Sequence, residues 1–334
     1  MSVPVIAFFN NKGGVGKTSL VYHVAWMMSE LGLRVVSADL DPQGNLSAAF
    51  LEEDRLVQLW PENAHTSTIF GSVLPLQRGI GDVTTPHLEQ INERLALIPG
   101  DMALSSFEDE LSQVWPKCMD RDSSQERAFR VTSAFWRVLQ DGARLHEAQV
   151  ILADLGPNLG AINRAALIAS DFLVVPLGPD LFSLQGLRNL GPTLKEWRKG
   201  WTDRLERYHN TDMALPKGGM KPLGYIVMQH SVRLDRPVKS YDKWIGRMPE
   251  HYWKYVLDES GYGGLSVKND PHCFALLKHY RSLMPMAQEA RKPIFHLKPA
   301  DGALGSHTNA VQVAHKDFAS LSRKIAGRVG ITIP

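Results

Sequence analysis

The sequence has little cysteine and no long hydrophobic run. Its two cysteines, Cys118 and Cys273, fit a reducing compartment and form no cluster with metal-ligand spacing. No apolar run approaches the ~18 residues that a membrane span needs. No charged-then-apolar leader with a small-residue cleavage site precedes the first apolar segment. We therefore expect a cytoplasmic protein that does not act at a membrane.

Excess charge of one sign is also absent overall, but the two halves of the chain differ. The formal net charge is +2, with 44% hydrophobic and 22% charged residues, which is typical of a globular protein. Residues 1–194 sum to −8 and residues 195–334 to +10. This asymmetry points to an acidic or nucleic-acid partner for the second half. Basic residues scattered over solvated faces would give the same count.

One stretch near the start carries the clearest chemistry. Residues 10–18 read N-N-K-G-G-V-G-K-T, between an apolar strand-like run at 5–9 and helical apolar spacing over 20–31. Backbone N–H groups of such a turn converge on an anion, and the following helix N-terminus adds partial positive charge. Lys17 can then reach the outer phosphates of a nucleotide, and the Thr18 hydroxyl can ligate Mg²⁺.

Three aspartates follow apolar runs that we predict to be parallel strands. Asp39 and Asp41 come after the run at 33–38, within the sequence D-L-D-P-Q-G-N. Asp154 ends the run at 150–154. The carboxyl ends of parallel strands are where an open α/β sheet places its ligand chemistry. Aspartate also simply ends strands and begins turns, so each short pattern is unspecific without the phosphate loop beside it.

These motifs together resemble the ParA/MinD family of deviant Walker A ATPases. The family loop K-G-G-x-G-K-[ST] is matched at every position of residues 12–18, and its D-x-D-P-Q-G-N segment is reproduced at 39–45. The sequence V-P at 175–176 followed by S-L-Q-G-L at 183–187 resembles the segment that lines the family's dimer face. After Asp154 the family usually has two prolines, and this chain keeps only Pro157.

The resemblance implies roles for these residues. Lys12 would cross a dimer interface to the phosphates of the partner subunit's nucleotide, so ATP would drive homodimerisation. Asp41 would position the attacking water, which makes Lys12 and Asp41 the expected catalytic residues. The cofactors would be ATP or ADP with Mg²⁺, and the metal residues Thr18, Asp39 and Asp154. The expected nucleotide-binding residues are Lys12, Gly13, Gly14, Val15, Gly16, Lys17, Thr18 and Ser19.

The implied fold is a single α/β P-loop domain over residues 1–334, with a mainly parallel sheet and helices on both faces. We expect insertions at about 50–94, read as surface helices and loops, and at about 231–279. One helix is expected at 128–139, and a strand end at Met284-Pro285. The stripe of Phe318, Leu321 and Ile325 on the last helix is expected to pack in the core rather than on a membrane. Because the first strand starts at Val5, we expect no helix-turn-helix domain before it.

Three functions remain compatible with the sequence. The first is an ATP-dependent dimerising switch with slow, partner-stimulated hydrolysis that binds non-specific DNA, as in partition or cargo positioning. The second is a nucleotide-gated regulatory or scaffold subunit without direct DNA binding, with the two insertions as partner surfaces. The third is an electron-transfer protein of the nitrogenase iron-protein type, which needs two cysteines near the dimer axis. Cys118 and Cys273 flank no matching motif, which disfavours the third function.

Overall fold

The apolar runs of the sequence form strands that are buried along almost their whole length, as expected for parallel strands covered on both faces. The computed structural model describes residues 2–61, 65–210, 212–230, 232–233, 236–237, 239–278, 280, 282–303 and 305–334. The chain divides into two units. Unit 1 comprises Met1–Phe9, Arg34–Leu173 and Thr193–Lys221, and unit 2 comprises Asn10–Leu33, Val174–Pro192 and Pro222–Pro334.

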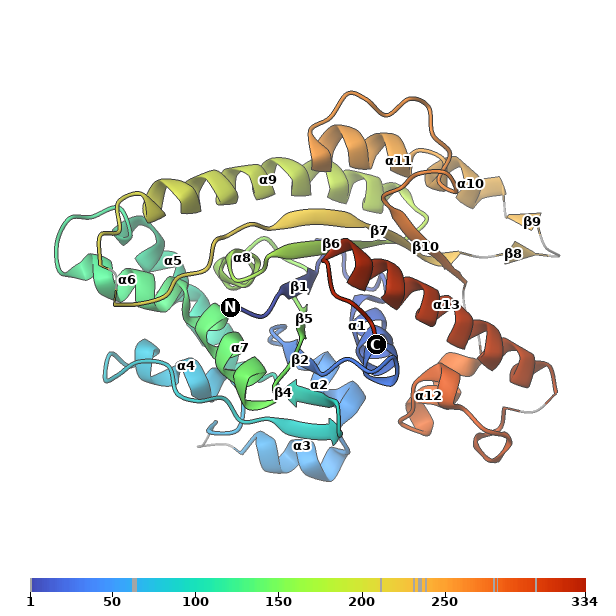
Figure 1. Cartoon of the computed structure of the whole chain (residues 1–334), viewed down its shortest axis with the longest axis horizontal. Helices are drawn as coiled ribbons and strands as arrows, with labels where there is room; N and C mark the ends of the chain where they lie inside the picture. Colours follow the sequence, from blue (N-terminus) through green and yellow to red (C-terminus); the bar gives the residue numbers. More distant parts are fainter. Residues whose placement is uncertain are drawn as a thin grey trace. The chain divides into compact units, whose positions relative to one another are not determined.

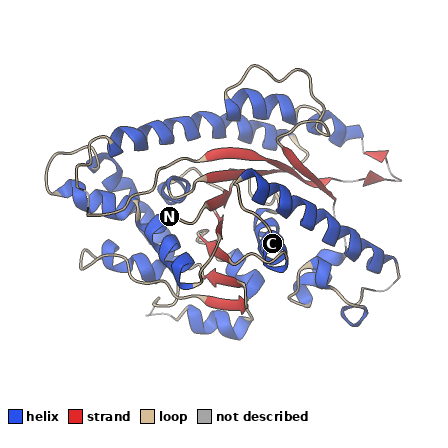
Figure 2. Ribbon diagram, in the orientation of Figure 1, coloured by secondary structure: helices blue, strands red, loops and turns tan. Residues whose placement is uncertain are grey.

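The described residues of unit 1 form five strands; Figure 2 draws all strands in red. The strands β1 (Val5–Phe8), β5 (Val150–Asp154), β2 (Val35–Asp39) and β4 (Leu95–Ile98) run parallel in that order. The fifth, β3 (Glu89–Asn92), is antiparallel to β4. Parallel neighbours bring their carboxyl ends to one edge, and Asp39 and Asp154 both end strands there.

Helices connect and cover these strands (Figure 1). The α-helices of unit 1 are α2 (Asn45–Phe50), α3 (Glu53–Leu59), α4 (Ile69–Gln77), α5 (Phe107–Lys117), α6 (Ser124–Thr132), α7 (Ala134–Leu145) and α8 (Ala161–Ile168). A 3₁₀ turn, η1 (Met102–Ser106), precedes α5. Helix α7 packs against β2 and β5, and α5 packs against α6 and α8.

In the described part of unit 2, β7 (Lys221–His230) pairs in parallel with β10 (Cys273–Lys278), and β8 (Val232–Arg233) forms a short antiparallel pair with β9 (Arg236–Pro237). Its helices are α1 (Lys17–Glu30), α10 (Lys239–Ile245), α11 (Met248–His251), the π-helix η2 (Tyr252–Leu257), α12 (Leu283–Glu289), the 3₁₀ turns η3 (Ile294–His296) and η4 (Pro299–Asp301), and α13 (Ser306–Arg328). Helix α13 packs against α1, η3 and β10. Strand β6 (Phe172–Leu177) and helix α9 (Leu181–Leu205) have residues in both units.

The α/β class predicted from the sequence is confirmed, and so are the strands around the phosphate loop and the aspartates. The predicted surface segment 50–94 does contain helices, α3 and α4, but it also ends in strand β3. The residues of β3 are mostly polar, and the strand pairs with β4 through its backbone. It therefore has no hydrophobic pattern from which a strand could be predicted. The predicted insertion 231–279 includes strand β10, which belongs beside β7, and residues 231, 234–235, 238 and 279 lie outside the described residues.

Two local predictions are wrong. The single helix expected at 128–139 is two helices, α6 and α7, which meet at Ser133. The Ser133 hydroxyl donates to Phe129 O over 2.7 Å, the side-chain-to-backbone bond by which serine competes with helix continuation. The strand end expected at Met284-Pro285 is instead part of α12. Pro285 lies in its first turn, where a missing N–H costs no hydrogen bond.

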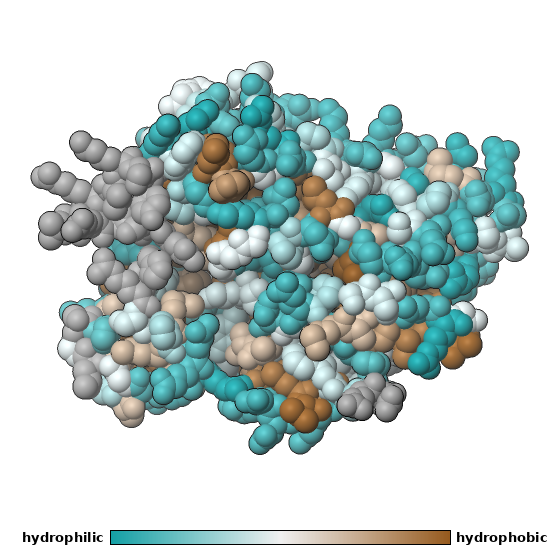
Figure 3. All heavy atoms as spheres, turned by 180° about the vertical axis from the view of Figure 1, so that it is seen from behind, coloured by the Kyte–Doolittle hydropathy of each residue, from teal (hydrophilic) through white to brown (hydrophobic). Residues whose placement is uncertain are grey.

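The stripe of Phe318, Leu321 and Ile325 on α13 is buried, as predicted. These side chains face the strand and helices that α13 packs against, whereas Arg323 and Lys324 are exposed. Among the described residues, no helix has the length and hydrophobicity to cross a membrane. The face of the molecule drawn in Figure 3 is mostly hydrophilic, with separate small hydrophobic areas.

Leu321→Ala should lower the free energy of unfolding by about 2–5 kcal/mol, because it leaves a cavity under α13 at a fully buried position. Arg323→Ala, on the exposed face of the same helix, should stay within about 0.5 kcal/mol of the parent. Urea unfolding followed by circular dichroism measures both. Equal stabilities of the two variants would show that the stripe does not pack in the core.

Candidate functional site

The loop between β1 and α1 is shaped by two glycines with left-handed backbones. Gly14 has φ 73° and Gly16 has φ 86°, which glycine adopts without strain. Gly16 is the N-cap of α1 and supplies no side chain, so no side-chain cap covers the first amide groups of the helix. Lys17 begins the helix and is 7% exposed. Amide groups and an ammonium at one helix end suit an anion.

Neighbouring segments of unit 2 hold the loop. Asn10 Nδ2 donates to Pro176 O over 2.6 Å, and Asn10 Oδ1 accepts from the Lys12 N–H over 3.0 Å. On α9, a Cβ at position 186 would lie 2.6 Å from Asn11 Oδ1, which is closer than real Cβ atoms approach. Gly186 is the glycine of the S-L-Q-G-L segment. Its place in the motif therefore has a packing reason beside the loop.

Lys12 is paired within its own chain. Its ammonium forms an ion pair with Asp180 and lies 5.8 Å from the centre of the Phe182 ring. Burial raises the pKa of the Asp180 carboxyl, but hydrogen bonds from Lys12 and from the Ser183 N–H outweigh this and hold the pKa below its usual value. Both side chains of the pair are about one third exposed, and Phe182 is 69% exposed. The pair is therefore accessible and weak enough to exchange partners.

A cavity of about 90 Å³ lies in unit 2 beside the loop end and the start of α1. Its lining is mostly apolar and comprises Gly16, Ser19, Leu20, His23, Met228, Leu277, Lys278, Tyr280, Met284, Ile294 and Phe318. His23 is anchored on both ring nitrogens: Nδ1 lies 2.6 Å from Ser19 O, and Nε2 accepts from the Ile294 N–H over 3.1 Å. Burial lowers the pKa of this imidazole to about 4, so it is neutral at pH 7.

The carboxylate group belongs to unit 1. Asp39 and Asp154 are paired in register at the ends of β2 and β5, and Phe8 of β1 is the partner of Asp154 on its other side. Both aspartates are fully buried. Burial raises the pKa of Asp39 to about 7, and the charge of Asp154 adds to that shift.

Asp39 is satisfied on one oxygen only. Its Oδ2 accepts from both the N–H and the hydroxyl of Ser47, each over 2.8 Å. Its Oδ1 is buried and has no hydrogen-bond partner among the described residues. A buried carboxylate oxygen in this state is costly and is a natural acceptor for a cation or its water shell.

Asp41 lies in the turn that follows β2 and is 5% exposed. Its Oδ1 accepts from the Gln43 N–H over 3.1 Å. A Cβ at Gly156 would lie 3.3 Å from that same oxygen, so the loop after β5 lies close to Asp41. Asn163 fixes this loop, because its Nδ2 donates to Gly156 O over 2.9 Å and to Asn158 O over 2.7 Å.

The comparisons with known proteins agree with the motif. A family model described as an AAA domain matches residues 3–207. The chain belongs to this family. Chromosome partitioning protein ParA of Caulobacter vibrioides is 30% identical over 202 residues, 60% of this chain and 66% of ParA. Sporulation initiation inhibitor protein Soj of Bacillus subtilis is 26% identical over 211 residues, 63% of this chain and 69% of Soj. The chain is therefore a P-loop ATPase of the ParA/MinD family.

Solved structures share the P-loop α/β fold with this ATPase. Protein DIP2308 from Corynebacterium diphtheriae superposes with a TM-score of 0.70 at 22% identity, covering 98% of both chains. A McdA variant from Cyanothece in complex with ATP gives 0.63 at 14% identity, covering 99% of this chain and 98% of McdA. The predicted fold class is thus confirmed. The curated relatives are only partly covered: the match extends over 66% of Caulobacter ParA and 45% of Protein IncC from Escherichia coli.

Sequence reasoning found the motif residues of this P-loop ATPase but missed the residues that hold them. The predicted residues from Lys12 to Ser19 lie together in unit 2, and the three predicted aspartates lie together in unit 1. Ser47, Asn163 and Asp180 were missed. Asp180 could have been found from its place just before the S-L-Q-G-L segment. Ser47 lies two residues beyond the D-L-D-P-Q-G-N segment, which does not itself include it, and Asn163 lies on α8 with no motif around it.

Asp39→Asn should change the pH dependence of stability in metal-free protein. The Asp39 pKa rises from 3.8 to about 7 on folding, so the folded state holds a proton that the unfolded state releases. The contribution of Asp39 to the free energy of unfolding therefore falls as pH rises from about 4 to about 7. Asparagine cannot titrate and removes this slope, so the variant should gain stability relative to the parent across that range.

Urea unfolding of both proteins in EDTA, at intervals of half a pH unit, measures this difference. His23 is present in both proteins and cancels from the comparison. A stability difference that does not vary with pH would contradict the raised pKa of Asp39.

Proposed function

We propose that this chain is an ATP-dependent dimerising switch with slow, partner-stimulated hydrolysis, and that its ATP-bound dimer binds non-specific DNA. The proposal that this chain binds ATP rests on where the loop and the aspartates follow neighbouring strands. The phosphate loop begins two residues after Phe8, and Phe8 is paired in register with Asp154, which is paired with Asp39. A loop for phosphates and a row of buried carboxylates therefore follow neighbouring strand ends, as phosphoryl transfer requires.

The chain's own residues suit Mg²⁺. The Asp39 oxygen without a partner among the described residues and the raised pKa of this carboxyl both favour a nearby cation. Thr18, Asp39 and Asp154 would hold the ion, which when bound neutralises charge on the nucleotide phosphates. Among the described residues, no three or more His, Cys, Asp or Glu side chains form a metal site. Phosphate and water would therefore complete the coordination, as is usual for Mg²⁺.

The remaining residues have distinct tasks in this proposal. Loop amides from Gly13 to Ser19 and the Lys17 ammonium would bind the phosphates, and the cavity beside Gly16 would take the base. Asp41 would orient the attacking water, held in place by its turn and by the loop at Gly156. Lys12 would leave Asp180 to reach the nucleotide of a second copy. The exposed Phe182 beside it would be covered in that dimer.

The DNA part rests on charge. Unit 2 exposes many basic side chains, and the second half of the chain has a net charge of +10. Among the described residues, these exposed side chains are Arg188, Lys243, Arg247, Lys254, Lys268, Lys278, Lys298, Lys316, Arg323, Lys324 and Arg328. The partition proteins among its relatives support a role in partition or cargo positioning.

The alternative remains a regulatory or scaffold subunit that uses the same switch without DNA. The cytoplasmic location stays a prediction.

Lys17→Ala should abolish ATP binding, whereas Asp41→Ala should keep it and lose most hydrolysis, because one residue holds phosphates and the other only orients water. Binding is measured by titration with a fluorescent ATP analogue, and hydrolysis by phosphate release. Lys117→Ala and Asp109→Ala, at exposed positions of α5, are the matched charge controls and should behave like the parent. ATP affinity retained by Lys17→Ala, or rapid turnover by Asp41→Ala, would refute these assignments.

ATP should increase affinity for non-specific double-stranded DNA relative to ADP and to no nucleotide, with affinity falling steeply as salt increases. Lys12→Ala should bind ATP but lose this increase together with ATP-dependent dimerisation, because the cross-subunit contact is missing. Fluorescence anisotropy with labelled DNA across a salt series, paired with light scattering for mass, tests both. Absence of DNA binding in every nucleotide state would favour the regulatory-subunit alternative.

A further inference from the structure

The sequence predicts only surface helices and loops in the segment 50–94, yet one of its residues contacts the backbone around the buried aspartates. Trp60 directly follows α3 (Glu53–Leu59) and is half-buried. It contacts two glycines that are far from each other in the sequence, Gly44 and Gly100. Each glycine belongs to backbone that holds one of the predicted aspartates in place.

The first contact is packing against the turn that carries Asp41. A Cβ at Gly44 would lie 2.9 Å from Trp60 Cζ2, so the indole ring lies directly on the Gly44 backbone. Gly44 has φ 65°, and its N–H donates to Asp41 O over 2.9 Å to close the turn. The position of the Asp41 carboxylate therefore depends on a turn that Trp60 covers.

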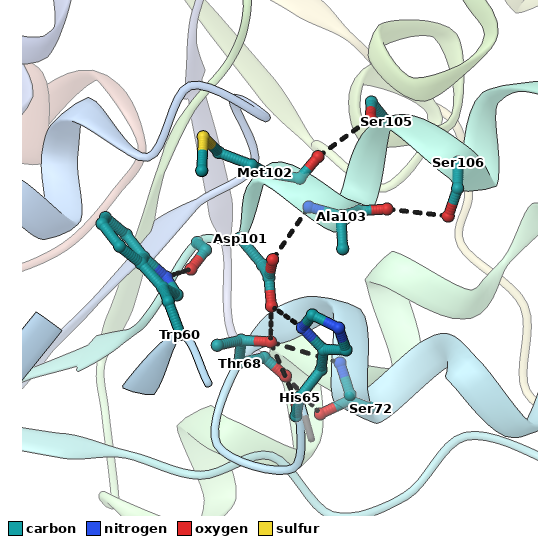
Figure 4. Close-up of polar contacts among 11 residues, drawn as sticks. Trp60, His65, Thr68, Ser72, Asp101, Met102, Ala103, Ser105 and Ser106 are labelled. Carbon is teal, nitrogen blue, oxygen red and sulfur yellow. Dashed lines mark hydrogen bonds and ion pairs between the residues drawn. The ribbon is translucent and has the colours of Figure 1, made fainter. Parts of the chain in front are cut away.

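The second contact is a hydrogen bond at the other aspartate. The indole N–H of Trp60 donates to Gly100 O over 2.8 Å (Figure 4). The Gly100 N–H donates to Ser47 Oγ over 2.8 Å, and the Ser47 hydroxyl donates to Asp39 Oδ2 over 2.8 Å. A Cβ at Gly100 would lie 2.7 Å from Asp39 Cγ. Trp60 thus joins a short hydrogen-bond chain that ends on Asp39.

The same segment is anchored again just beyond Trp60. Asp101, which is 3% exposed, accepts hydrogen bonds from His65 Nδ1 and Thr68 Oγ1, each over 2.8 Å (Figure 4). It also accepts from the Ala103 N–H over 2.8 Å. The two ends of the connection after α3 are therefore fixed to Gly100 and Asp101, which are adjacent residues at the end of β4. This makes Trp60 a fixed support rather than a loose surface side chain.

We propose that Trp60 is a positioning residue for ATP hydrolysis, which holds the Asp41 turn and the Gly100–Ser47–Asp39 chain in their working geometry. The proposal rests on the hydrolytic function proposed above. The two contacts that carry the proposal are made to Gly44 and Gly100, which lie outside the loop predicted to bind the phosphates. Loss of Trp60 should therefore slow the chemical step while leaving nucleotide affinity largely intact, because small displacements of a catalytic group reduce rate strongly.

Steady-state kinetics of two variants test the rate effect. Trp60→Ala removes both contacts and should lower kcat about 10- to 100-fold, with KM for ATP changed less than about threefold. Trp60→Phe keeps a ring over Gly44 and loses only the N–H, so it should recover part of the lost kcat. The controls are Val57→Ala, exposed on the same helix, and Trp253→Phe, a hydrogen-bonded indole of unit 2. A kcat equal to the parent in Trp60→Ala would overturn the proposal.

A double-mutant cycle tests the contact without relying on hydrolysis. Gly44→Ala should lower the urea midpoint of the parent, because of both the positive φ and the close indole ring. In the Trp60→Ala background the clash with the indole ring is gone and only the backbone strain at the positive φ remains. The same substitution should therefore lower the urea midpoint less. Equal shifts in both backgrounds would overturn the contact. If the parent shows no ATPase activity, the proposed function fails by itself, and the cycle still reports on Trp60.

Discussion

The candidate site depends on two buried carboxylates placed opposite each other by strand register. Asp39 and Asp154 are Cα partners at the ends of β2 and β5, and both are fully buried. Burial, together with the charge of Asp154, raises the pKa of Asp39 to about 7. The register of the β2–β5 pair holds the two residues opposite each other at the strand ends. The fold therefore creates a local demand for positive charge that the described residues around Asp39 leave open, as its unpaired Oδ1 shows.

The same constraint explains the glycines around the aspartates. Gly44, Gly100 and Gly156 lie against Trp60, Asp39 and Asp41, respectively, at distances that leave little or no space for a Cβ. Because glycine has no Cβ, the backbone at these three positions can lie closer to its neighbour than any other residue would allow. Glycine here serves close approach, and only Gly44 among the three also needs a positive φ. The site is thus built mostly from backbone, with Ser47 and Asn163 as the side chains that brace it.

The sequence could reveal what is local and could not reveal what is brought together by folding. The phosphate loop, its flanking strand and helix, and the aspartates at strand ends are contiguous patterns, and they were predicted correctly as elements. Ser47, Asn163 and Trp60 act through hydrogen bonds between residues that lie 5 to 53 positions apart in the sequence, and no periodicity encodes such pairs. The break between α6 and α7 coincides with one side-chain hydrogen bond of Ser133, and strand β3 depends on backbone pairing with β4. Neither interaction leaves a pattern in the sequence.

The two segments first taken as insertions differ in their relation to the family fold. The matched family region, residues 3–207, includes α3 and Trp60 but ends before β7. In the later segment, Asp270 accepts from Tyr225 Oη over 2.7 Å and from Trp253 Nε1 over 3.1 Å, which ties the π-helix η2 to β7. Those bonds stabilise the strand pair β7–β10, whereas the bonds of Trp60 stabilise the carboxylates. A change in the segment around Trp60 should therefore act on chemistry, and a change in the later segment on the scaffold of unit 2.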